Sequence, residues 1–257
     1  MSRRHRIQIG LGLIVLLGVV YARQFGTQTA DVLLVHYKFR GLSDVSKIPV
    51  PLDDLAVSKE THPRATCSGF DYELPWDDID SARNKKVGTI CVTTFRSGNA
   101  FWFSTFPAND FVTGLQNESH MSPEQFRRHV GESTSNSDYG FMEQMLNARP
   151  SEVSVTASPN AADFFMWLLV VKAMAMPPAD SGIYAIRLHD FKGFQFENRK
   201  APRFQIEDDL YNDSGGIDVI LFLKDRQSAA NITQPQINRI LDSIHQSNEH
   251  QHPLTTD

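Results

Sequence analysis

The sequence predicts an α+β fold, in which a single N-terminal transmembrane helix precedes a mainly antiparallel sheet that packs against helices. Three observations support this prediction. The chain opens with arginines and one apolar run over residues 7–22. Strand-like apolar patterns come before and after a helical middle region. The connections between successive strands are too short for parallel crossovers, which favours antiparallel pairing.

Residues 1–22 have the pattern of a membrane-export segment. Arg3, Arg4 and Arg6 form a basic start, and the run that follows, IQIGLGLIVLLGVVYA, contains no charged side chain. A spanning helix needs about 20 apolar residues, and arginines at both ends of a shorter run, here Arg6 and Arg23, can extend it by snorkelling. We therefore expect this run to anchor the chain in the membrane, with the bulk of the protein on the extracytoplasmic side.

A cleavable signal peptide is the alternative interpretation. Val20 and Ala22 are small apolar residues at the two positions that a signal peptidase reads. Cleavage after Ala22 would release a secreted or periplasmic protein. We favour the anchor because Tyr21 and Arg23 are typical of the membrane interface and no polar region precedes Ala22.

The rest of the chain divides into a stalk, one domain and a tail. Residues 23–65 contain several prolines among polar residues, so we expect a stalk or linker there. Residues 66–246 form the predicted extracytoplasmic domain, and residues 247–257 form a polar tail. With 41% hydrophobic residues over 257 positions, the chain can bury a full core.

The first half of the domain contains a hairpin and three helices. The patterns over residues 87–95 and 100–106, separated by Arg96-Ser97-Gly98-Asn99, predict two paired strands. Ser122 and Gln125 form a capping box that begins a helix. Apolar residues predict a second helix over 138–147 and a buried third one over 161–176, whose apolar run is too short to span a membrane.

The second half returns to strands and ends in a helix. Strands are predicted over residues 183–188, 194–197, 204–208 and 217–223, with turns at 192–193 and 212–216. Thr233 and Gln236 form another capping box. The helix that follows is amphipathic, with apolar residues at Ile237, Ile240, Leu241 and Ile244.

No motif in the sequence identifies a reaction. The nucleophile elbow, the phosphate-binding loop, the H-E-x-x-H zinc motif, C-x-x-C and the dinucleotide fingerprint are all missing from the sequence. His189 and Asp190 are the candidate catalytic residues, because a base and an orienting carboxylate are two parts of a hydrolytic triad. Adjacent strand residues point to opposite faces, which argues against this pair. We expect no cofactor.

Two groups of acidic residues could bind a hard cation or shift one another's pKa values. The first, which provides the candidate metal ligands, contains Asp77, Asp78 and Asp80. The second contains Glu207, Asp208 and Asp209, with Asp213. Neither has the spacing of a calcium-binding loop, and both adjoin predicted turns, where Asp is favoured for its backbone hydrogen bonds. We therefore expect solvated turn acids rather than a metal site.

The only two cysteines, Cys67 and Cys91, are candidates for a disulfide. We expect them in neighbouring strands of the first hairpin-like unit, on the extracytoplasmic side, where an oxidising compartment permits a bridge. The alternative is two separately buried thiols, since free cysteine packs as a small apolar residue. The sequence leaves both interpretations open.

The net charge of −5 argues against nucleic acid as a partner, because an acidic chain repels phosphate backbones. Our first hypothesis is a membrane-anchored domain that binds a protein or envelope component without catalysis. The alternatives are an anchored or secreted hydrolase that uses His189 and one acidic group, and a released small-ligand-binding protein. The latter would need a pocket lined by aromatic residues, of which the sequence offers Phe70, Tyr72, Trp76, Phe101, Trp102 and Phe103.

Overall fold

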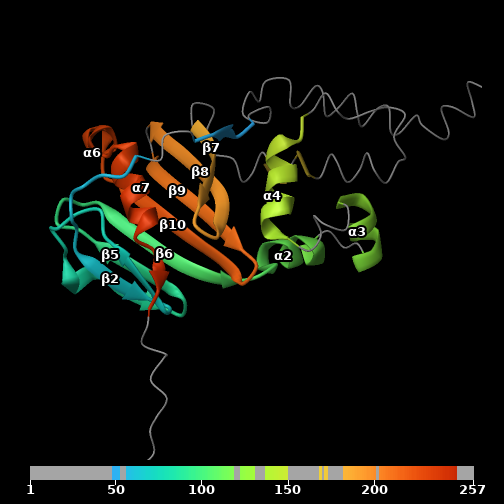
Figure 1. Cartoon of the computed structure of the whole chain (residues 1–257), viewed down its shortest axis with the longest axis horizontal. Coiled ribbons are helices and arrows are strands. Elements are labelled where there is room, and N and C mark those ends of the chain that lie inside the picture. Colours follow the sequence, from blue (N-terminus) through green and yellow to red (C-terminus); the bar gives the residue numbers. More distant parts are fainter. Residues whose placement is uncertain are drawn as a thin grey trace, which may run out of the picture. The chain divides into compact units, whose positions relative to one another are not determined.

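The structure is a computed structural model of the chain, and it describes residues 48–52, 56–118, 122–130, 137–149, 168–169, 171–172, 182–200 and 203–247 (Figure 1). The predicted membrane helix, the first part of the predicted stalk, most of the predicted helix over 161–176 and nearly all of the tail lie outside these residues. Among the described residues, no helix is long and apolar enough to cross a membrane.

The chain divides into two compact units. One comprises Met1–Lys47 and Asn147–Met176, and few of its residues are described. Within it, the Lys172 ammonium donates to the backbone carbonyl of Ala148 at 2.9 Å. The other unit comprises Ile48–Leu146 and Pro177–Asp257 and contains all the strands among the described residues. The rest of this section concerns that unit.

A large, nearly all-antiparallel sheet forms the centre of the unit. Within the described residues it has eight strands, in the order β1 (Val50–Pro51), β7 (Gly182–Leu188), β8 (Phe191–Lys200), β9 (Arg203–Asn212), β10 (Gly215–Leu223), β6 (Ala100–Pro107), β5 (Ile90–Thr94) and β4 (Lys85–Val87). Only the short β1 pairs in parallel, with β7. This arrangement confirms the predicted α+β class with a mainly antiparallel sheet.

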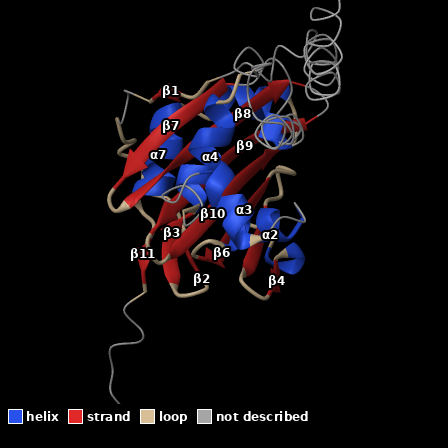
Figure 2. Cartoon of the chain, turned by 90° about the vertical axis from the view of Figure 1, so that its right-hand side faces the viewer, coloured by secondary structure: helices blue, strands red, loops and turns tan. Residues whose placement is uncertain are grey.

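A small sheet and the helices cover the large sheet. The small sheet has the order β11 (His245–Gln246), β3 (Phe70–Glu73), β2 (Arg64–Cys67). The helices are α2 (Asp110–Glu118), α3 (Pro123–Val130), α4 (Asp138–Asn147), α6 (Arg226–Asn231) and α7 (Gln234–Asp242), with a short 3-10 helix η2 (Ser81–Arg83). Helix α7 and the small sheet lie on one side of the large sheet, and α4 lies on the other (Figures 1 and 2).

The hydrophobic core lies between the large sheet and α7. Alternate residues of the central strands point to this side and are fully buried, and we call this side the core face. It is formed by Ile206 and Leu210 of β9, Ile217, Val219 and Leu221 of β10, and Phe101 and Phe103 of β6. The apolar stripe of α7 packs against these residues, as the i, i+3, i+4 pattern predicts. The core face of the sheet and the apolar stripe of α7 thus form one apolar layer.

Several predicted local features are confirmed. Helix α4 covers the predicted residues 138–147. The Gln125 amide donates to Ser122 Oγ at 3.2 Å and the Ser122 amide donates to Gln125 Oε1 at 2.9 Å, which is a capping box. The capping box of Thr233 and Gln236 is present at the start of α7.

The predicted turn at residues 192–193 is wrong. The chain turns three residues earlier, at His189 and Asp190, and β8 runs through Gly193 without interruption. His189 has a positive φ of 49°, which a turn requires of at least one residue. Gly193 is needed for another reason: a Cβ there would lie 1.9 Å from the backbone carbonyl oxygen of Asp209 on β9. The glycine indicates a close approach of two strands rather than a turn.

The described part of the predicted stalk lies against the domain. The Leu52 amide donates to the Ala185 carbonyl of β7 at 3.0 Å, and the Ser58 amide donates to the Pro235 carbonyl of α7 at 3.0 Å. The Asn238 side chain donates to the Ala56 carbonyl at 2.9 Å. These contacts extend the folded unit toward the N-terminus, ahead of residue 66.

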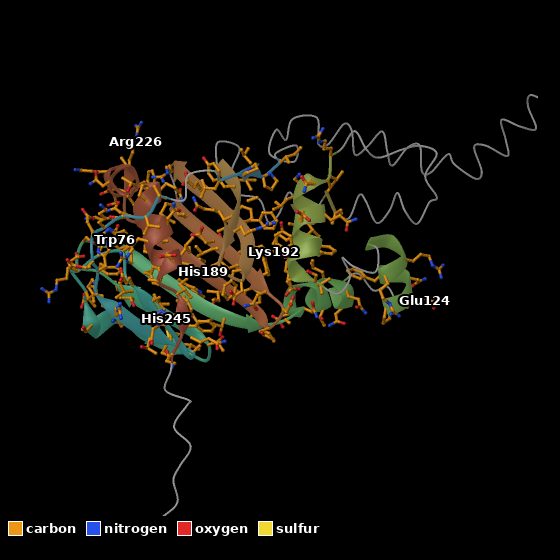
Figure 3. The ribbon with its side chains drawn as sticks, viewed as in Figure 1. Trp76, Glu124, His189, Lys192, Arg226 and His245 are labelled. Carbon is orange, nitrogen blue, oxygen red and sulfur yellow. A yellow bond between two sulfur atoms is a disulfide. The ribbon has the colours of Figure 1, made fainter. Side chains whose placement is uncertain are left out.

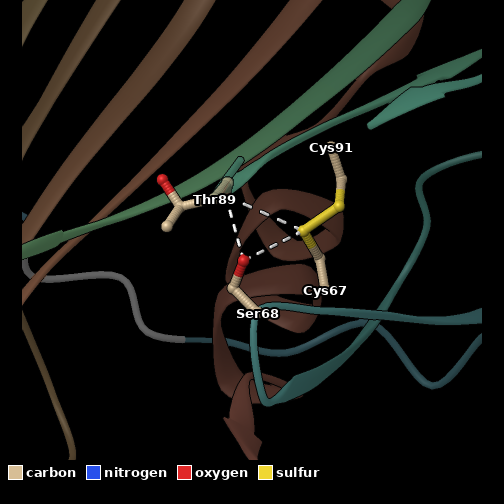
Figure 4. The surroundings of a disulfide bond; sticks show 4 residues. All are labelled: Cys67, Ser68, Thr89 and Cys91. Carbon is tan, nitrogen blue, oxygen red and sulfur yellow. Dashed lines mark hydrogen bonds between the residues drawn. A yellow bond between two sulfur atoms is a disulfide. The ribbon is translucent and has the colours of Figure 1, made fainter. Parts of the chain in front are cut away.

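Cys67 and Cys91 form a disulfide that connects the two sheets (Figure 4). The expectation that they lie in neighbouring strands is wrong, because β2 pairs with β3 and β5 pairs with β4 and β6. Ser68 and Gly69 both have positive φ, so the chain reverses tightly after Cys67 and β3 takes the place beside β2. The Ser68 hydroxyl donates to the Thr89 carbonyl at 3.2 Å beside the bridge.

Candidate functional site

The structure does not bring the two candidate catalytic residues together. The His189 ring lies 3.2 Å from a carboxylate oxygen of Asp242 on α7, and both side chains are about half exposed, at 53% and 45%. They line a cleft of about 190 Å³ with apolar neighbours such as Leu188 and Leu241. No serine, threonine or cysteine is among the described residues that line this cleft. Asp190 lines a different cavity.

The first acidic group does not converge on one point. Asp78 accepts from the Ser97 amide at 2.6 Å. Asp80 pairs with Arg83 at 3.4 Å, and Asp77 lies 4.0 Å from His62. Each carboxylate therefore has a partner of its own, and the three do not form one site.

The second acidic group is not in a turn, and the expectation of solvated turn acids is wrong for three of its members. Glu207, Asp208 and Asp209 lie within strand β9. Because side chains alternate along a strand, Asp208 points to the core face, whereas Glu207 and Asp209 point to the opposite side. There they meet Asp218 of β10, which pairs directly with Asp209. We call this side of the large sheet the acidic face.

The three carboxylates of the acidic face lie close enough to share one cation. One oxygen from each of Glu207, Asp209 and Asp218 lies within 4.8 Å of the others. The Gln205 side chain donates to Glu207 at 2.7 Å, and the Ser104 hydroxyl donates to Asp218 at 3.3 Å. Oxygen atoms at this spacing are the ligands that hard divalent cations prefer, so this group is where the described residues could hold a metal ion.

Burial and mutual repulsion perturb these carboxylates strongly. Burial raises the pKa of Asp218 to about 7, with a further contribution from Glu207. Burial, followed by the charges of Glu207, Asp218 and Asp208, also holds the pKa of Asp209 well above its usual range. Like charges in a partly dry site cannot all ionise at low cost. The acidic face therefore takes up a proton or another positive charge readily.

A polar cavity of about 410 Å³ lies at one end of the unit, where four segments meet. The segments are residues 108–109 before α2, residues 137–139 at the start of α4, the β7–β8 turn, and the β9–β10 turn. The lining residues include Asp138, Tyr139, Asp190, Lys192, Tyr211 and Asp213. Both strand turns are short and hydrogen-bonded; in the β9–β10 turn the Ser214 amide donates to Asn212 Oδ1 at 2.9 Å.

Stacked aromatic rings support this cavity. Tyr139 of α4 stacks on Phe194 of β8, with centroids 5.3 Å apart and planes inclined by 7°, and lies edge-on to Tyr211 at 6.4 Å. Phe106 of β6 packs on the other side of Tyr211 at 5.8 Å. The Phe106 ring occupies the space above Gly216, where a Cβ would lie 2.0 Å from two ring atoms. A glycine at this position thus allows the ring that braces Tyr211 to lie flat on the sheet.

The charged groups of the cavity have different environments. Asp138 is only 5% exposed and accepts from the Val112 amide at 2.9 Å, which caps the start of α2. Burial raises its pKa despite the backbone hydrogen bonds that lower it. Asp190, Lys192 and Asp213 are exposed. The Lys192 ammonium lies over the Tyr139 ring, 4.3 Å from its centroid, on the side of the sheet next to α4 (Figure 3).

The cavity and the acidic face are connected through Tyr211. Its ring lines the cavity, and its hydroxyl hydrogen-bonds to Asp209. Burial first, and then the charges of Asp209 and Asp138, raise the pKa of Tyr211 well above its ordinary value. Tyr211 therefore remains a neutral donor between the two acidic regions.

Sequence reasoning does not single out Tyr139, Lys192 or Tyr211. Asp190 and Asp213 were singled out, but for a catalytic pair and a turn cluster. No local pattern brings the β7–β8 turn, the β9–β10 turn and the start of α4 together; their meeting depends on strand order. Most of the aromatic residues proposed for a groove contribute to the core instead, where Tyr72, Phe101 and Phe103 are buried and Tyr72 stacks on Phe103 at 4.4 Å. Trp102 lies on the acidic face, where it pairs with Ile220 and is partly buried.

Comparisons with known proteins add no family assignment: no protein-family model matches the chain, and no curated protein matches it significantly.

Proposed function

We propose that the chain is a membrane-anchored extracytoplasmic domain that binds a small polar ligand in the cavity at Tyr139 and Tyr211 without catalysing a reaction. The observation that carries this proposal is the cavity itself. At about 410 Å³ it has the size of a small-molecule site, and polar side chains from four segments converge on it. Two strand turns and the start of a helix hold these side chains in place.

The proposed location rests on the sequence and on the disulfide. Residues 7–22 are apolar and follow three arginines, as in a signal anchor with a cytoplasmic N-terminus. A bridge between Cys67 and Cys91 suits an oxidising compartment outside the cytoplasm. Cleavage after Ala22 remains the alternative, and it would leave the ligand site unchanged.

The hydrogen bonds and the exposure of the candidate polar groups favour binding without catalysis. The most buried carboxylate of the cavity, Asp138, already accepts a backbone hydrogen bond that caps α2. The hydrolase alternative needs a nucleophile beside His189, and the described lining of that cleft offers none. The pair of His189 and Asp242 is also about half exposed, whereas a triad carboxylate is normally buried.

The anchor is tested by membrane extraction of the full-length protein. We expect it to resist high salt and high pH and to require detergent, because hydrophobic insertion is insensitive to both. N-terminal sequencing supplies the control. A mature protein that begins at Arg23 and remains in the soluble fraction would contradict the anchor and favour release.

The cavity is tested by ligand-induced thermal stabilisation in a panel of small sugars, amines and carboxylates. We expect at least one class to raise the melting temperature of the wild-type protein, since binding to the folded state alone stabilises it. Ala108→Trp, which fills the cavity, should abolish the increase. Ala82→Trp on η2 is the matched control, because Ala82 is exposed and does not line the cavity. Equal stabilisation in both variants would place binding elsewhere.

A further inference from the structure

The charges around the cavity are predominantly negative. Three carboxylates line it, those of Asp138, Asp190 and Asp213, against one ammonium group, that of Lys192. The three carboxyl groups of the acidic face lie on the same side of the sheet as Tyr211. Clefts lined by one sign of charge concentrate ligands of the opposite sign.

The Tyr139 ring has two neighbours from strand β8. Phe194 stacks on it at 5.3 Å with nearly parallel planes. The Lys192 ammonium also lies over the ring, at 4.3 Å from its centroid. An ammonium within about 6 Å of a ring centroid is attracted by the negative face of the π system. The cavity thus contains a position at which an ammonium group is already held.

Lys192 holds this position with a side chain that is free to leave it. The side chain is exposed, and in the part of the chain that the structure describes it forms no salt bridge with the acids around the cavity. Among the described residues, the ammonium group of Lys192 contacts the Tyr139 ring. Movement of Lys192 into solvent would uncover the part of the Tyr139 ring that its ammonium group contacts and leave only carboxylates as charged groups in the lining.

We propose that the ligand of this cavity is a small organic cation, whose ammonium group takes the place of the Lys192 ammonium on the Tyr139 ring. This inference rests on the proposed function and specifies its ligand class. The carboxylates of Asp190 and Asp213 supply the attractive field at the rim, and Asp138 supplies it at the base. An anionic ligand would be attracted by the one ammonium group in the lining and repelled by the three carboxylates.

Calorimetric titration of the full-length protein in detergent tests the charge requirement. The probes are choline and its uncharged carbon isostere 3,3-dimethyl-1-butanol, which have nearly the same shape. We expect choline to bind and the isostere to bind at least tenfold more weakly, since only the former is attracted by the ring face and the carboxylates. Glucose serves as a neutral polar probe.

Substitutions at the ring and at Lys192 test the position. Tyr139→Leu should weaken choline binding about tenfold, while Tyr139→Phe should retain it because the ring remains. Lys192→Met should tighten binding about threefold to tenfold, since it removes the competing ammonium and keeps the apolar stem. Lys85→Met, on the exposed edge strand β4, is the matched control and should change nothing.

The outcomes that contradict the inference can be distinguished from one another. Equal binding of choline and its isostere would show that the positive charge is not recognised. Weaker choline binding in Lys192→Met would show that choline does not take the place of the Lys192 ammonium. If glucose binds instead and Ala108→Trp abolishes that binding, the cavity remains a ligand site and only the cation is wrong. If none of the probes binds and no compound in the thermal panel stabilises the protein, the proposed function fails as well.

Discussion

The two faces of strands β9 and β10 are built from neighbouring residues but have opposite characters. On the core face, Ile206 and Leu221 are cross-strand partners and are both fully buried under α7. One position along, on the acidic face, the partners Glu207 and Ile220 are only partly covered. At these positions the core face is therefore more completely buried than the acidic face.

Asp208 is an exception to the apolar character of the core face. It lies on the core face with no exposed surface, and in the described part of the chain neither of its carboxylate oxygens has a hydrogen-bond partner. Burial, followed by the charge of Glu197, holds its pKa well above the usual range. Three consecutive acids in one strand necessarily place one on the wrong face. Asp208 is therefore a destabilising group within the core when it is ionised.

The largest expected effect separates the two faces directly. Leu221→Ala should lower the free energy of unfolding by about 3 to 5 kcal/mol, because it leaves a cavity in a fully packed core. Ile220→Ala, the next residue on the acidic face, should cost less than half as much, since Ile220 is only half-buried. Urea denaturation measures both. Similar losses would show that the acidic face is packed as tightly as the core face.

The second effect concerns the bridge on the core side. Replacing Cys67 and Cys91 together by alanine should cost about 3 kcal/mol, because the bridge closes a loop with a sequence separation of 24 and restricts the unfolded chain. Mass spectrometry of the denatured, non-reduced protein after alkylation is the companion measurement. Two alkylated thiols would show that the cysteines are free.

The third effect is a pH dependence of stability that comes from raised carboxyl pKa values. A raised pKa means that the folded state binds more protons than the unfolded state above about pH 4, so stability falls as the pH rises through the folded-state value. For Asp218 that value is about 7. We expect Asp218 alone to account for a loss of about 2 kcal/mol between pH 5.5 and pH 8, as each raised unit corresponds to about 1.4 kcal/mol, and the other raised carboxyl groups to add to it.

Asparagine substitutions on the core face and on the acidic face show how much each carboxyl group contributes to this pH dependence. Asp208→Asn should raise stability at pH 8 and flatten the profile more than Asp218→Asn does, because Asp208 is completely buried. Chemical denaturation at a series of pH values gives both profiles. A wild-type stability that rises from pH 5.5 to pH 8 would contradict the assignment of raised pKa values.

The smallest expected effect is at His189. His189→Asn should change stability by less than about 0.5 kcal/mol, since the pair with Asp242 is about half exposed and asparagine tolerates a positive φ. Ligand binding in the cavity should be unaffected. A loss of a hydrolytic activity in this variant would instead favour the enzyme hypothesis.

Sequence patterns predicted the elements that depend on local chemistry. The capping boxes at Ser122 and Thr233 and the apolar stripe of α7 involve residues within one or two helical turns, and these predictions are confirmed. The antiparallel class followed from short connections. Such features depend on spacing and side-chain type, both of which are visible in the sequence.

Features that depend on strand order could not be predicted. Gly193 was taken as part of a turn because its role, the close approach of Asp209, involves a different strand. The acids of β9 were assigned to a turn because the strand was expected to end at residue 208, whereas it continues to Asn212. The contact of Lys192 with Tyr139 joins a strand to a distant helix, and no spacing rule indicates it.

Hydrogen–deuterium exchange of the full-length protein, with and without choline, tests the central claim that the acidic side of the sheet is the binding side. We predict slower exchange in peptides that cover residues 137–139, 190–192 and 211–215, which line the cavity. Exchange in residues 64–73 of the small sheet and 237–245 on the core side should change little. Slowing confined to the segments around the His189 cleft, or to the small sheet, would contradict the account.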